Sequence, residues 1–343
     1  MRKISILLTA GIFLLIIFIG CRQKAIYHRP ARQDENYQPH YIENVAVDDY
    51  HVTGTNRQYF QAAPQRAVVV GETLLETFVA LGIDDSILLA AGYEGTSFRP
   101  EAQYASRYAK LSVQRGLRLN KETVLAMCPD FIAGGQVVFT ADALSSTEFW
   151  NERNINTYCS VNANSPTSSR QRETLEGEYA FLLGLGKIYG REELAGELVA
   201  AMERDLQQLQ QAAQGRRRPR VLIVEDLGGT LVSYGRNKLA GDICSRLHGI
   251  VEESDATIGL EDILRIDPDV LFAVTSDGEP EQAAEHFRQL PALRHCRCVK
   301  NNQVYGITLS YTYNSAVKTG AGIRRLAGGM YPDLYKELDK RDL

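Results

Sequence analysis

The sequence lacks the short motifs that mark common enzyme chemistries. It has no GxSxG nucleophile elbow, no HExxH zinc motif, no P-loop and no Gly-rich dinucleotide fingerprint. Ser, His and Asp residues are present, but no pattern places a nucleophile beside a base. An exported enzyme is therefore a weakly supported alternative, which assays of ester and glycoside turnover would test.

Clusters of like charge and of metal ligands are also scarce. The chain has 38 Lys and Arg against 42 Asp and Glu, a net charge of -4, and its one basic block is Arg216–Arg218. Nucleic acid is not an expected partner, because binding it needs a clustered basic face. The six histidines fall in the polar N-terminal segment or on expected helices and turns. A site for bare zinc or manganese is therefore not expected either.

The cysteines form no CxxC pair. His295, Cys296 and Cys298 lie in one short stretch, but no second cluster accompanies them, so they fall short of a zinc pattern. After Cys21 an odd number remains, which cannot all pair internally, and we interpret them as thiols without deciding whether any disulfide forms. These cysteines are Cys128, Cys159, Cys244, Cys296 and Cys298.

The N-terminus has the form of an export signal. Arg2 and Lys3 precede an apolar run, Ile4 to Ile19, that is shorter than the ~20 residues of a membrane-spanning helix. We therefore predict a signal peptide over residues 1–20. The phrase "FIGC" resembles a bacterial lipoprotein box, with Phe18 where that box usually has Leu, and in such a box Cys21 is lipidated. Residues 21–60 are then expected to be a polar tether with little periodicity.

The rest of the chain predicts two lobes of α/β class with mostly parallel sheets. Short apolar runs of strand type alternate with segments that have apolar residues at helical spacing, as in βα units. Between the lobes, a stretch without proline predicts one long helix, with a break expected near Gly184 to Gly190. The expected boundaries are an N-terminal lobe at 66–171, the connecting helix at 172–214 and a C-terminal lobe at 219–343.

One phrase occurs twice, as "LNKETVLAMCPDFIAGG" from Leu119 and "IGLEDILRIDPDVLFAV" from Ile258. In both copies a Glu falls near the start of a helix that ends at Pro-Asp and leads into a buried strand. Asn120 is the expected N-cap of the first helix, and Thr257 or Gly259 of the second. A carboxylate in a first turn is favoured by the helix dipole alone. The apolar positions point the other way, however, which leaves Glu122 and Glu261 exposed on equivalent surfaces, ready for a basic partner.

Five stretches together resemble the substrate-binding proteins of ABC importers for ferric siderophores, haem or cobalamin. The resemblance runs from about Arg66 to Pro332 and is specific through the order of the stretches, since each alone is weak. They are "RAVVVGETLLETFVALGIDDSILLAAG", "LNKETVLAMCPDFIAG", "RVLIVEDLGGTLVSYGRNKLAGDICSRLHGI", "IGLEDILRIDPDVLFAV" and "LPALRHCRCVKNNQVYGI".

The resemblance implies a role for the two repeated acids. The family has an Asn-Leu-Glu phrase before its first Pro-Asp, and here Lys121 replaces the Leu while Glu122 and Glu261 are kept. In such proteins these carboxylates dock onto arginines of the membrane permease, one from each lobe. A monomer is expected on the same grounds, and the membrane anchor is expected from Cys21.

The ligand is expected between the lobes, at the carboxyl ends of the strands. The loops expected there are Gly71–Thr73, Gly92–Arg99, Gly135–Val138, Ser233–Lys238 and Leu309–Tyr313. Aromatic side chains and Arg suit a bulky, partly anionic chelate or macrocycle. The residues predicted to bind the ligand are Tyr93, Arg99, Trp150, Tyr234, Arg236, Tyr311 and Tyr313.

Three ligand classes stay open at this stage. A ferric siderophore is the first choice, because the expected cleft loops offer Arg and Tyr but no evident His or Met for haem iron. Cobalamin comes second, since its amide-rich rim also suits Tyr and Trp contacts. A carrier that passes haem or a corrinoid to another surface protein is a further alternative, and the paired glutamates favour a permease instead.

Overall fold

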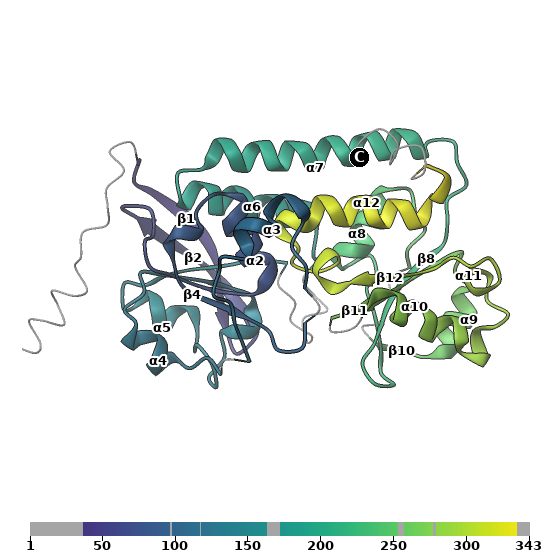
Figure 1. Cartoon of the computed structure of the whole chain (residues 1–343), viewed down its shortest axis with the longest axis horizontal. Coiled ribbons are helices and arrows are strands. Elements are labelled where there is room, and N and C mark those ends of the chain that lie inside the picture. Colours follow the sequence, from purple (N-terminus) through teal and green to yellow (C-terminus); the bar gives the residue numbers. More distant parts are fainter. Residues whose placement is uncertain are drawn as a thin grey trace, which may run out of the picture.

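The two lobes lie side by side along the long axis of the molecule, and helices join them along one face (Figure 1). This confirms the prediction of a two-lobed α/β protein with mostly parallel sheets. The computed structural model describes residues 37–96, 98–116, 118–162, 172–252, 257–276 and 279–334.

The N-terminal lobe is built on five parallel strands in the order β5-β4-β3-β6-β7. The central strands are short and apolar, and all four residues of β3 are buried, as expected for a parallel sheet that is covered on both faces. The strands are β3 (Ala67–Val70), β4 (Ile87–Gly92), β5 (Gln114–Arg115), β6 (Phe131–Gly134) and β7 (Asn156–Cys159).

Helices cover both faces of this sheet. Leu75 and Phe78 of one helix pack into the larger core, which continues into the other lobe, and Val124 and Trp150 pack into a smaller core on the opposite face. The helices are α2 (Glu72–Ala80), η1 (Asp84–Ser86), α3 (Ala102–Tyr108), α4 (Lys121–Ala126), η2 (Gln136–Val138) and α5 (Thr147–Asn151).

The C-terminal lobe repeats the plan with one change. Its sheet has the order β10-β9-β8-β11-β12, in which β8, β11 and β12 are parallel and β9 is antiparallel to both of its neighbours. The two-residue Gly228-Gly229 turn, with both residues in the left-handed region, allows β8 to return directly as β9. The strands are β8 (Val221–Asp226), β9 (Leu231–Ser233), β10 (Thr257–Ile258), β11 (Val270–Thr275) and β12 (Val304–Thr308).

The helices of this lobe again lie on both faces of the sheet. Ile263 and Phe287 pack into a core on one face, while Ile243 and Ile323 belong to the large core shared with the other lobe. The helices are α8 (Leu239–Arg246), α9 (Leu260–Ile266), α10 (Pro280–Gln289), η3 (Pro291–Leu293), α11 (Arg297–Lys300), η4 (Leu309–Tyr311), η5 (Ala316–Lys318) and α12 (Thr319–Met330).

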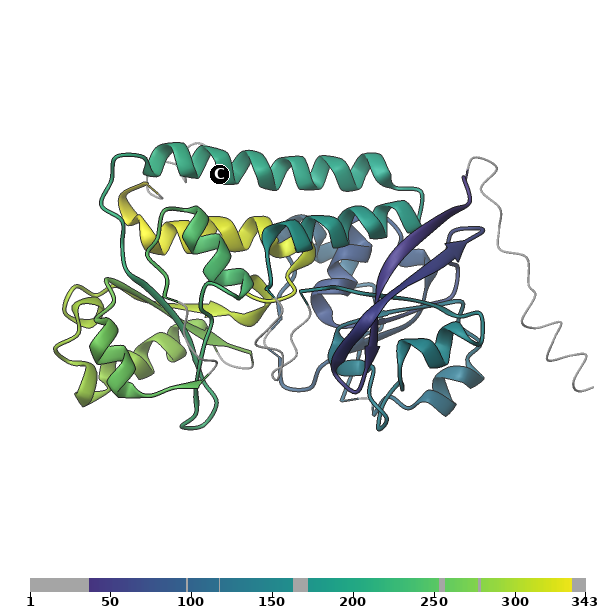
Figure 2. The ribbon, with the colours of Figure 1, turned by 180° about the vertical axis from the view of Figure 1, so that it is seen from behind.

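The connection between the lobes is two helices instead of one. α6 (Leu175–Ile188) and α7 (Glu192–Ala213) are separated at Gly190, which has the left-handed φ of 64° that ends a helix. This break lies within the stretch where one was expected. α7, about 33 Å long at 1.5 Å per residue, runs over both lobes and lies against α6 and α12 (Figures 1 and 2).

Residues 40–60, which we predicted as part of an irregular tether, form a β-hairpin, so that part of the prediction is wrong. β1 (His40–Asp48) and β2 (His51–Phe60) are antiparallel, and Figure 2 shows them crossing the back of the N-terminal lobe. The sequence of the hairpin is polar because most side chains of β2 face solvent. Ile42, Val47 and Phe60 are buried and attach the hairpin to the lobe.

Two buried amides bind the edge strand β7 to this hairpin. Thr157 donates its N–H to Gln58 Oε1 (2.7 Å) and accepts at its carbonyl from Gln58 Nε2 (3.0 Å) and Asn44 Nδ2 (3.1 Å). Cys159 donates its N–H to Asn44 Oδ1 (3.0 Å). Side-chain amides thus satisfy backbone groups that an edge strand otherwise leaves unpaired, and they cover that edge.

The repeated phrase has the same structure in both lobes. Each helix ends at a residue with left-handed φ just before the proline, 52° at Cys128 and 44° at Asp267. The next carboxylate accepts from the backbone N–H at the start of the neighbouring strand: Asp130 from Arg66 and Asp269 from Arg220, both at 2.9 Å. The Asp of the phrase therefore joins two parallel strands, and this structural task does not involve the Glu.

The predicted signal peptide at residues 1–20 and the predicted lipidation of Cys21 lie outside the described residues. Within the described ranges, no helix is both long and apolar enough to span a membrane. All five cysteines after Cys21 are free thiols, and only Cys128 is not fully buried.

We predict that Gln58→Met lowers the free energy of unfolding by about 1–3 kcal/mol, because the backbone N–H of Thr157 loses its acceptor while it stays buried. Urea unfolding measures this. Arg57→Met, an exposed change on the same strand, is the control and should alter stability by less than about 0.5 kcal/mol. Equal stability of the two variants would show that the amide does not hold the edge.

Candidate functional site

A cavity of about 180 Å³ lies between the lobes at the carboxyl ends of the strands. The loops after β3, β4 and β6 border it from one lobe, and the ends of β11 and β12 from the other. Four of the five loops expected at the cleft contribute, while Ser233–Lys238 does not. The lining residues are Val70, Gly71, Glu72, Thr73, Leu74, Tyr93, Thr96, Phe98, Gly135, Val137, Ser276, Thr308, Leu309, Ser310, Tyr313 and Asn314.

Glu72 shapes the N-terminal side of this cavity. It is the first residue of α2 and is only 4% exposed, and its Oε1 accepts from Tyr93 N (3.1 Å) and Thr96 Oγ1 (2.7 Å). A Cβ at Gly92 would lie 2.7 Å from this oxygen, so the approach requires glycine. Glu72 thereby fixes the loop that carries the aromatic wall. We did not predict this role, although a Glu directly after "VVVG" was a visible signal.

The C-terminal side of the cavity is polar. Thr308 and Ser310 share a hydroxyl–hydroxyl hydrogen bond of 3.1 Å, and Thr73 Oγ1 donates to the carbonyl of Asn314 (3.1 Å) across the cleft. The side-chain oxygen of Asn314 is buried and accepts no hydrogen bond within the described part of the chain. Because buried polar atoms are nearly always paired, this oxygen is suited to accept a donor from a bound molecule.

Beside the cleft, a buried lysine joins the lobes. Lys318 is fully buried in η5, and its Nζ lies 2.9 Å from Glu101 Oε1 and 3.4 Å from Glu76 Oε2. Tyr311 also donates to Glu101 (2.8 Å). Desolvation acts to raise the pKa of Glu101, but the hydrogen bond and charge of Lys318 outweigh it and lower that pKa, whereas desolvation raises the pKa of Glu76. Lys318 therefore pairs chiefly with ionised Glu101.

A second buried acid, Glu178 of α6, contacts the same segment. Its two oxygens accept from Ala316 N (2.5 Å) and Asn162 Nδ2 (2.9 Å). Burial raises the pKa of Glu178 from 4.5 to about 7, against the lowering effect of these hydrogen bonds. The contact between α6 and the chain after β12 thus includes a carboxyl that titrates near neutral pH.

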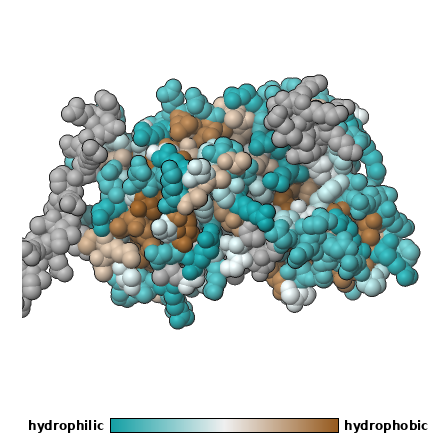
Figure 3. All heavy atoms as spheres, viewed as in Figure 1, coloured by the Kyte–Doolittle hydropathy of each residue, from teal (hydrophilic) through white to brown (hydrophobic). Residues whose placement is uncertain are grey.

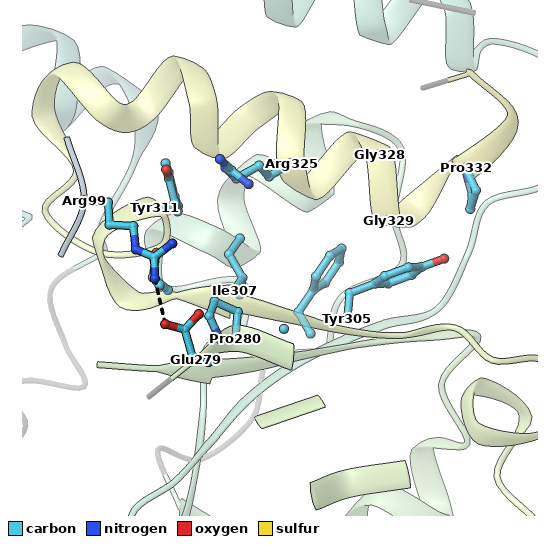
Figure 4. A pocket seen from close by; sticks show the side chains of 13 residues that line it. Arg99, Glu279, Pro280, Tyr305, Ile307, Tyr311, Arg325, Gly328, Gly329 and Pro332 are labelled. Atoms are coloured by element: carbon cyan, nitrogen blue, oxygen red, sulfur yellow. Dashed lines mark hydrogen bonds and ion pairs between the residues drawn. The ribbon is translucent and has the colours of Figure 1, made fainter. Parts of the chain in front are cut away.

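The seven predicted ligand-binding residues lie in different parts of the structure. Tyr93 and Tyr313 line the cleft cavity. Arg99 and Tyr311 line a separate, neighbouring cavity (Figure 4). Arg236 is exposed on the loop after β9 and lines neither cavity.

Two of the seven predictions are wrong because the side chains belong to the core. Trp150 is fully buried, and its Nε1 donates to the carbonyl of Leu144 within the small core of the N-terminal lobe. Tyr234 is 4% exposed and donates to Glu225 (2.7 Å). Both residues follow or precede a strand in sequence, but they face the sheet instead of the cleft.

Glu122 and Glu261 are both exposed, near the starts of α4 and α9. Asn120 caps α4 by accepting from Thr123 N (2.8 Å), as predicted, and Gly259 is the N-cap of α9. Figure 1 places the two helices toward opposite ends of the long axis, in the half of the molecule away from α7. Figure 3 shows mainly hydrophilic residues over the described surface of the C-terminal lobe on this side. Both helices therefore lie on the side of the molecule away from α7.

Metal-binding groups are few. Among the described residues, no group of three or more His, Cys, Asp or Glu is arranged to hold a metal ion. Neither the cleft cavity nor its neighbour is lined by His, Met or Cys. These two cavities therefore lack the imidazole, thioether and thiolate ligands that usually hold haem iron.

Two α/β lobes with a cavity between the carboxyl ends of their sheets define a two-lobed binding protein. The chain belongs to the periplasmic binding protein family, whose model matches residues 68–311. This confirms the resemblance to substrate-binding proteins of ABC importers.

Individual relatives share the fold over most of the chain. The "uncharacterized ABC transporter substrate-binding lipoprotein YvrC" of Bacillus subtilis is 21% identical over 98% of this chain and all of that protein. A periplasmic binding protein from Veillonella parvula has a TM-score of 0.76 at 28% identity, covering 87% of this chain and 93% of that one. An "ABC-type Fe3+-hydroxamate transport system" structure from Saccharomonospora viridis has a TM-score of 0.65 at 21% identity, covering 84% and 99%. Further chains of this fold are described as siderophore-binding and heme-binding proteins.

We predict a pH-dependent contribution of Glu178 to stability. Because its pKa is raised in the folded state, its contribution is fully present below about pH 4.5 and is lost as the pH rises to about 7. The loss is on the order of 3 kcal/mol. Urea unfolding at pH 5 and pH 8 should show a smaller difference between the two pH values for Glu178→Gln than for the parent. Glu203→Gln, an exposed change on α7, should leave the difference unchanged, and an unchanged difference in Glu178→Gln would contradict the assignment.

Proposed function

We propose that this protein captures a ferric siderophore-type chelate between its lobes and delivers it to the permease of an ABC importer. The observation that supports this most is the composition of the cleft. Tyr93 and Phe98 of the N-terminal lobe and Tyr313 of the C-terminal lobe supply aromatic surface, and hydroxyl and amide groups of the C-terminal lobe complete the lining. Such a lining suits the rings or amides of an organic chelator, which itself supplies the oxygens that hold the iron.

The volume of the cavity indicates where the chelate binds. About 180 Å³ is less than the ~300 Å³ at which pockets for drug-sized ligands begin. Tyr93 is 40% exposed and lies against Gly71, with its ring 3.5 Å from where a Cβ would stand. Because this ring lies at the exposed edge of the cleft, we propose that it turns aside on binding and that the chelate sits in the mouth with one side in water.

The other ligand classes fit less well. The two cavities offer haem iron tyrosine but no His, Met or Cys, and the tryptophan expected to contact a corrinoid rim is buried in the core. The absorption spectrum of protein purified from iron-limited cells separates the three. A charge-transfer band of a ferric chelate is expected, and a Soret band or a corrinoid spectrum would replace our first choice. Calorimetry is the method for titration, because the single Trp lies outside the cleft.

We propose further that Cys21 carries a lipid anchor, in keeping with the description of the relative YvrC as a lipoprotein. Tyr37 already donates a hydrogen bond to the carbonyl of Ile188 on α6 (3.0 Å), so the proposed tether consists of residues 22–36. A chain of that length spans at most about 50 Å. Labelling with a radioactive fatty acid tests this, and Cys21→Ser is the negative control.

We predict that Tyr93→Ala and Tyr313→Ala each weaken binding of the ferric chelate about tenfold, because each removes ring surface from the cleft. Calorimetric titration of the purified variants measures the dissociation constants. Tyr59→Ala, an exposed change on the outer hairpin, is the control and should bind like the parent. Parental affinity in both cleft variants would place the ligand elsewhere.

We predict that Glu122→Arg combined with Glu261→Arg abolishes uptake while ligand affinity stays within about twofold, since both side chains are exposed and far from the cavity lining. Uptake of the labelled chelate by cells and calorimetry measure the two quantities. Glu193→Arg with Glu203→Arg places the same charges on α7, on the opposite side of the molecule, and should transport normally. Normal uptake by the first double variant would indicate a carrier that does not use these acids for docking.

A further inference from the structure

A second cavity lies outside the cleft. It has a volume of about 510 Å³ and lies between α12 and the edge strand β12, next to the start of α10 (Figure 4). It shares only Thr308 with the cleft cavity. We call it the α12 groove. The family function assigned above makes no use of it.

Glycines allow the elements around the α12 groove to pack closely. A Cβ at Gly306 of β12 would lie 1.7 Å from the carbonyl oxygen of Pro280, and one at Gly329 of α12 would lie 2.5 Å from the ring of Phe272. β12 therefore packs directly against the backbone at the start of α10, and α12 packs against the ring of Phe272 on β11. The rings of Phe272 and Tyr305, with centroids 6.0 Å apart, supply the apolar surface at one end.

Two guanidinium groups mark the other end, near the lobe boundary. Arg99 reaches from the N-terminal lobe and pairs with Glu279 at 2.7 Å. Arg325 lies over the ring of Tyr311, 4.4 Å from its centroid, and is exposed. Arg325 forms no ion pair within 4 Å in the described ranges, and the nearby Glu101 already binds Lys318 and Tyr311. With two Arg and one Glu, the groove carries an excess of positive charge.

We propose that the α12 groove is a second binding site, for a planar aromatic carboxylate. The apolar surface of Tyr305 and Ile307 in the lining accepts the ring system, and Arg325 donates to the carboxylate. A volume of 510 Å³ is within the range of small-molecule sites. Arg99 is the second donor, and its pairing with Glu279 connects occupancy of the groove to a contact between the lobes.

The test is a calorimetric titration of the full chain with 2-naphthoate, a planar aromatic carboxylate, and with neutral 2-naphthamide of the same shape. We expect saturable binding of 2-naphthoate that is at least about tenfold tighter than binding of 2-naphthamide. Arg325→Met should weaken 2-naphthoate binding about tenfold or more. Arg324→Met is the matched control, because the neighbouring side chain pairs with Asp205 on α7 instead of lining the groove, and it should bind within about twofold of the parent.

Two outcomes would overturn the proposal. One is the absence of saturable 2-naphthoate binding at millimolar concentration in protein whose thermal unfolding midpoint shows it to be folded. The other is loss of 2-naphthoate binding in the Tyr93→Ala Tyr313→Ala variant, which would place the anion in the cleft. Retained binding in that cleft variant, together with loss in Arg325→Met, supports a site that is separate from the cleft.

Discussion

The buried ammonium of Lys318 fixes how the two lobes stand relative to each other. It follows β12 of the C-terminal lobe, yet its partners Glu76 and Glu101 belong to the N-terminal lobe. Breaking a buried ion pair by removal of one partner costs about 3–5 kcal/mol, because the remaining charge is left without compensation. Glu178 holds the adjacent Ala316 N–H from α6. The cleft therefore has walls whose spacing is set by charges outside it, and large movements of the lobes would have to break these contacts.

The repeated Pro-Asp phrase combines two tasks that the sequence does not separate. Asp130 and Asp269 accept hydrogen bonds from backbone N–H groups at the start of the neighbouring strand in each lobe. Glu122 and Glu261 stand eight residues earlier, exposed on the first turn of a helix whose start is fixed by Asn120 or Gly259. Duplication of a folding unit explains the Asp on physical grounds alone. The duplication leaves Glu122 and Glu261 available to a partner, since neither carboxylate forms a hydrogen bond or ion pair among the described contacts.

The sequence predicts the parts of this fold that depend on periodicity. Apolar runs such as "AVVV" and "VLFAVT" are buried strands. Asn120 is the N-cap of α4, as predicted from its amide side chain and from the Glu in the first turn that follows. The hairpin escaped prediction because its inward side chains include Asn44 and Gln58, whose burial makes sense only once Thr157 lies beside them. Trp150 and Tyr234 were misplaced for a related reason, since proximity to a strand end does not reveal which way a ring points.

The cleft itself is built so that its lining can vary while its shape is kept. Tyr93, Phe98 and Tyr313 project into the cavity, but the loops that carry them are held from behind by Glu72 and by the bond between Thr73 and the carbonyl of Asn314. A substitution among the projecting side chains changes which molecule fits and leaves the backbone bonds in place. A substitution at Glu72 instead releases the whole loop, since the N–H of Tyr93 and the hydroxyl of Thr96 lose one acceptor together. This separation of scaffold from contact surface explains why the sequence predicts the place of the ligand more readily than its chemical identity.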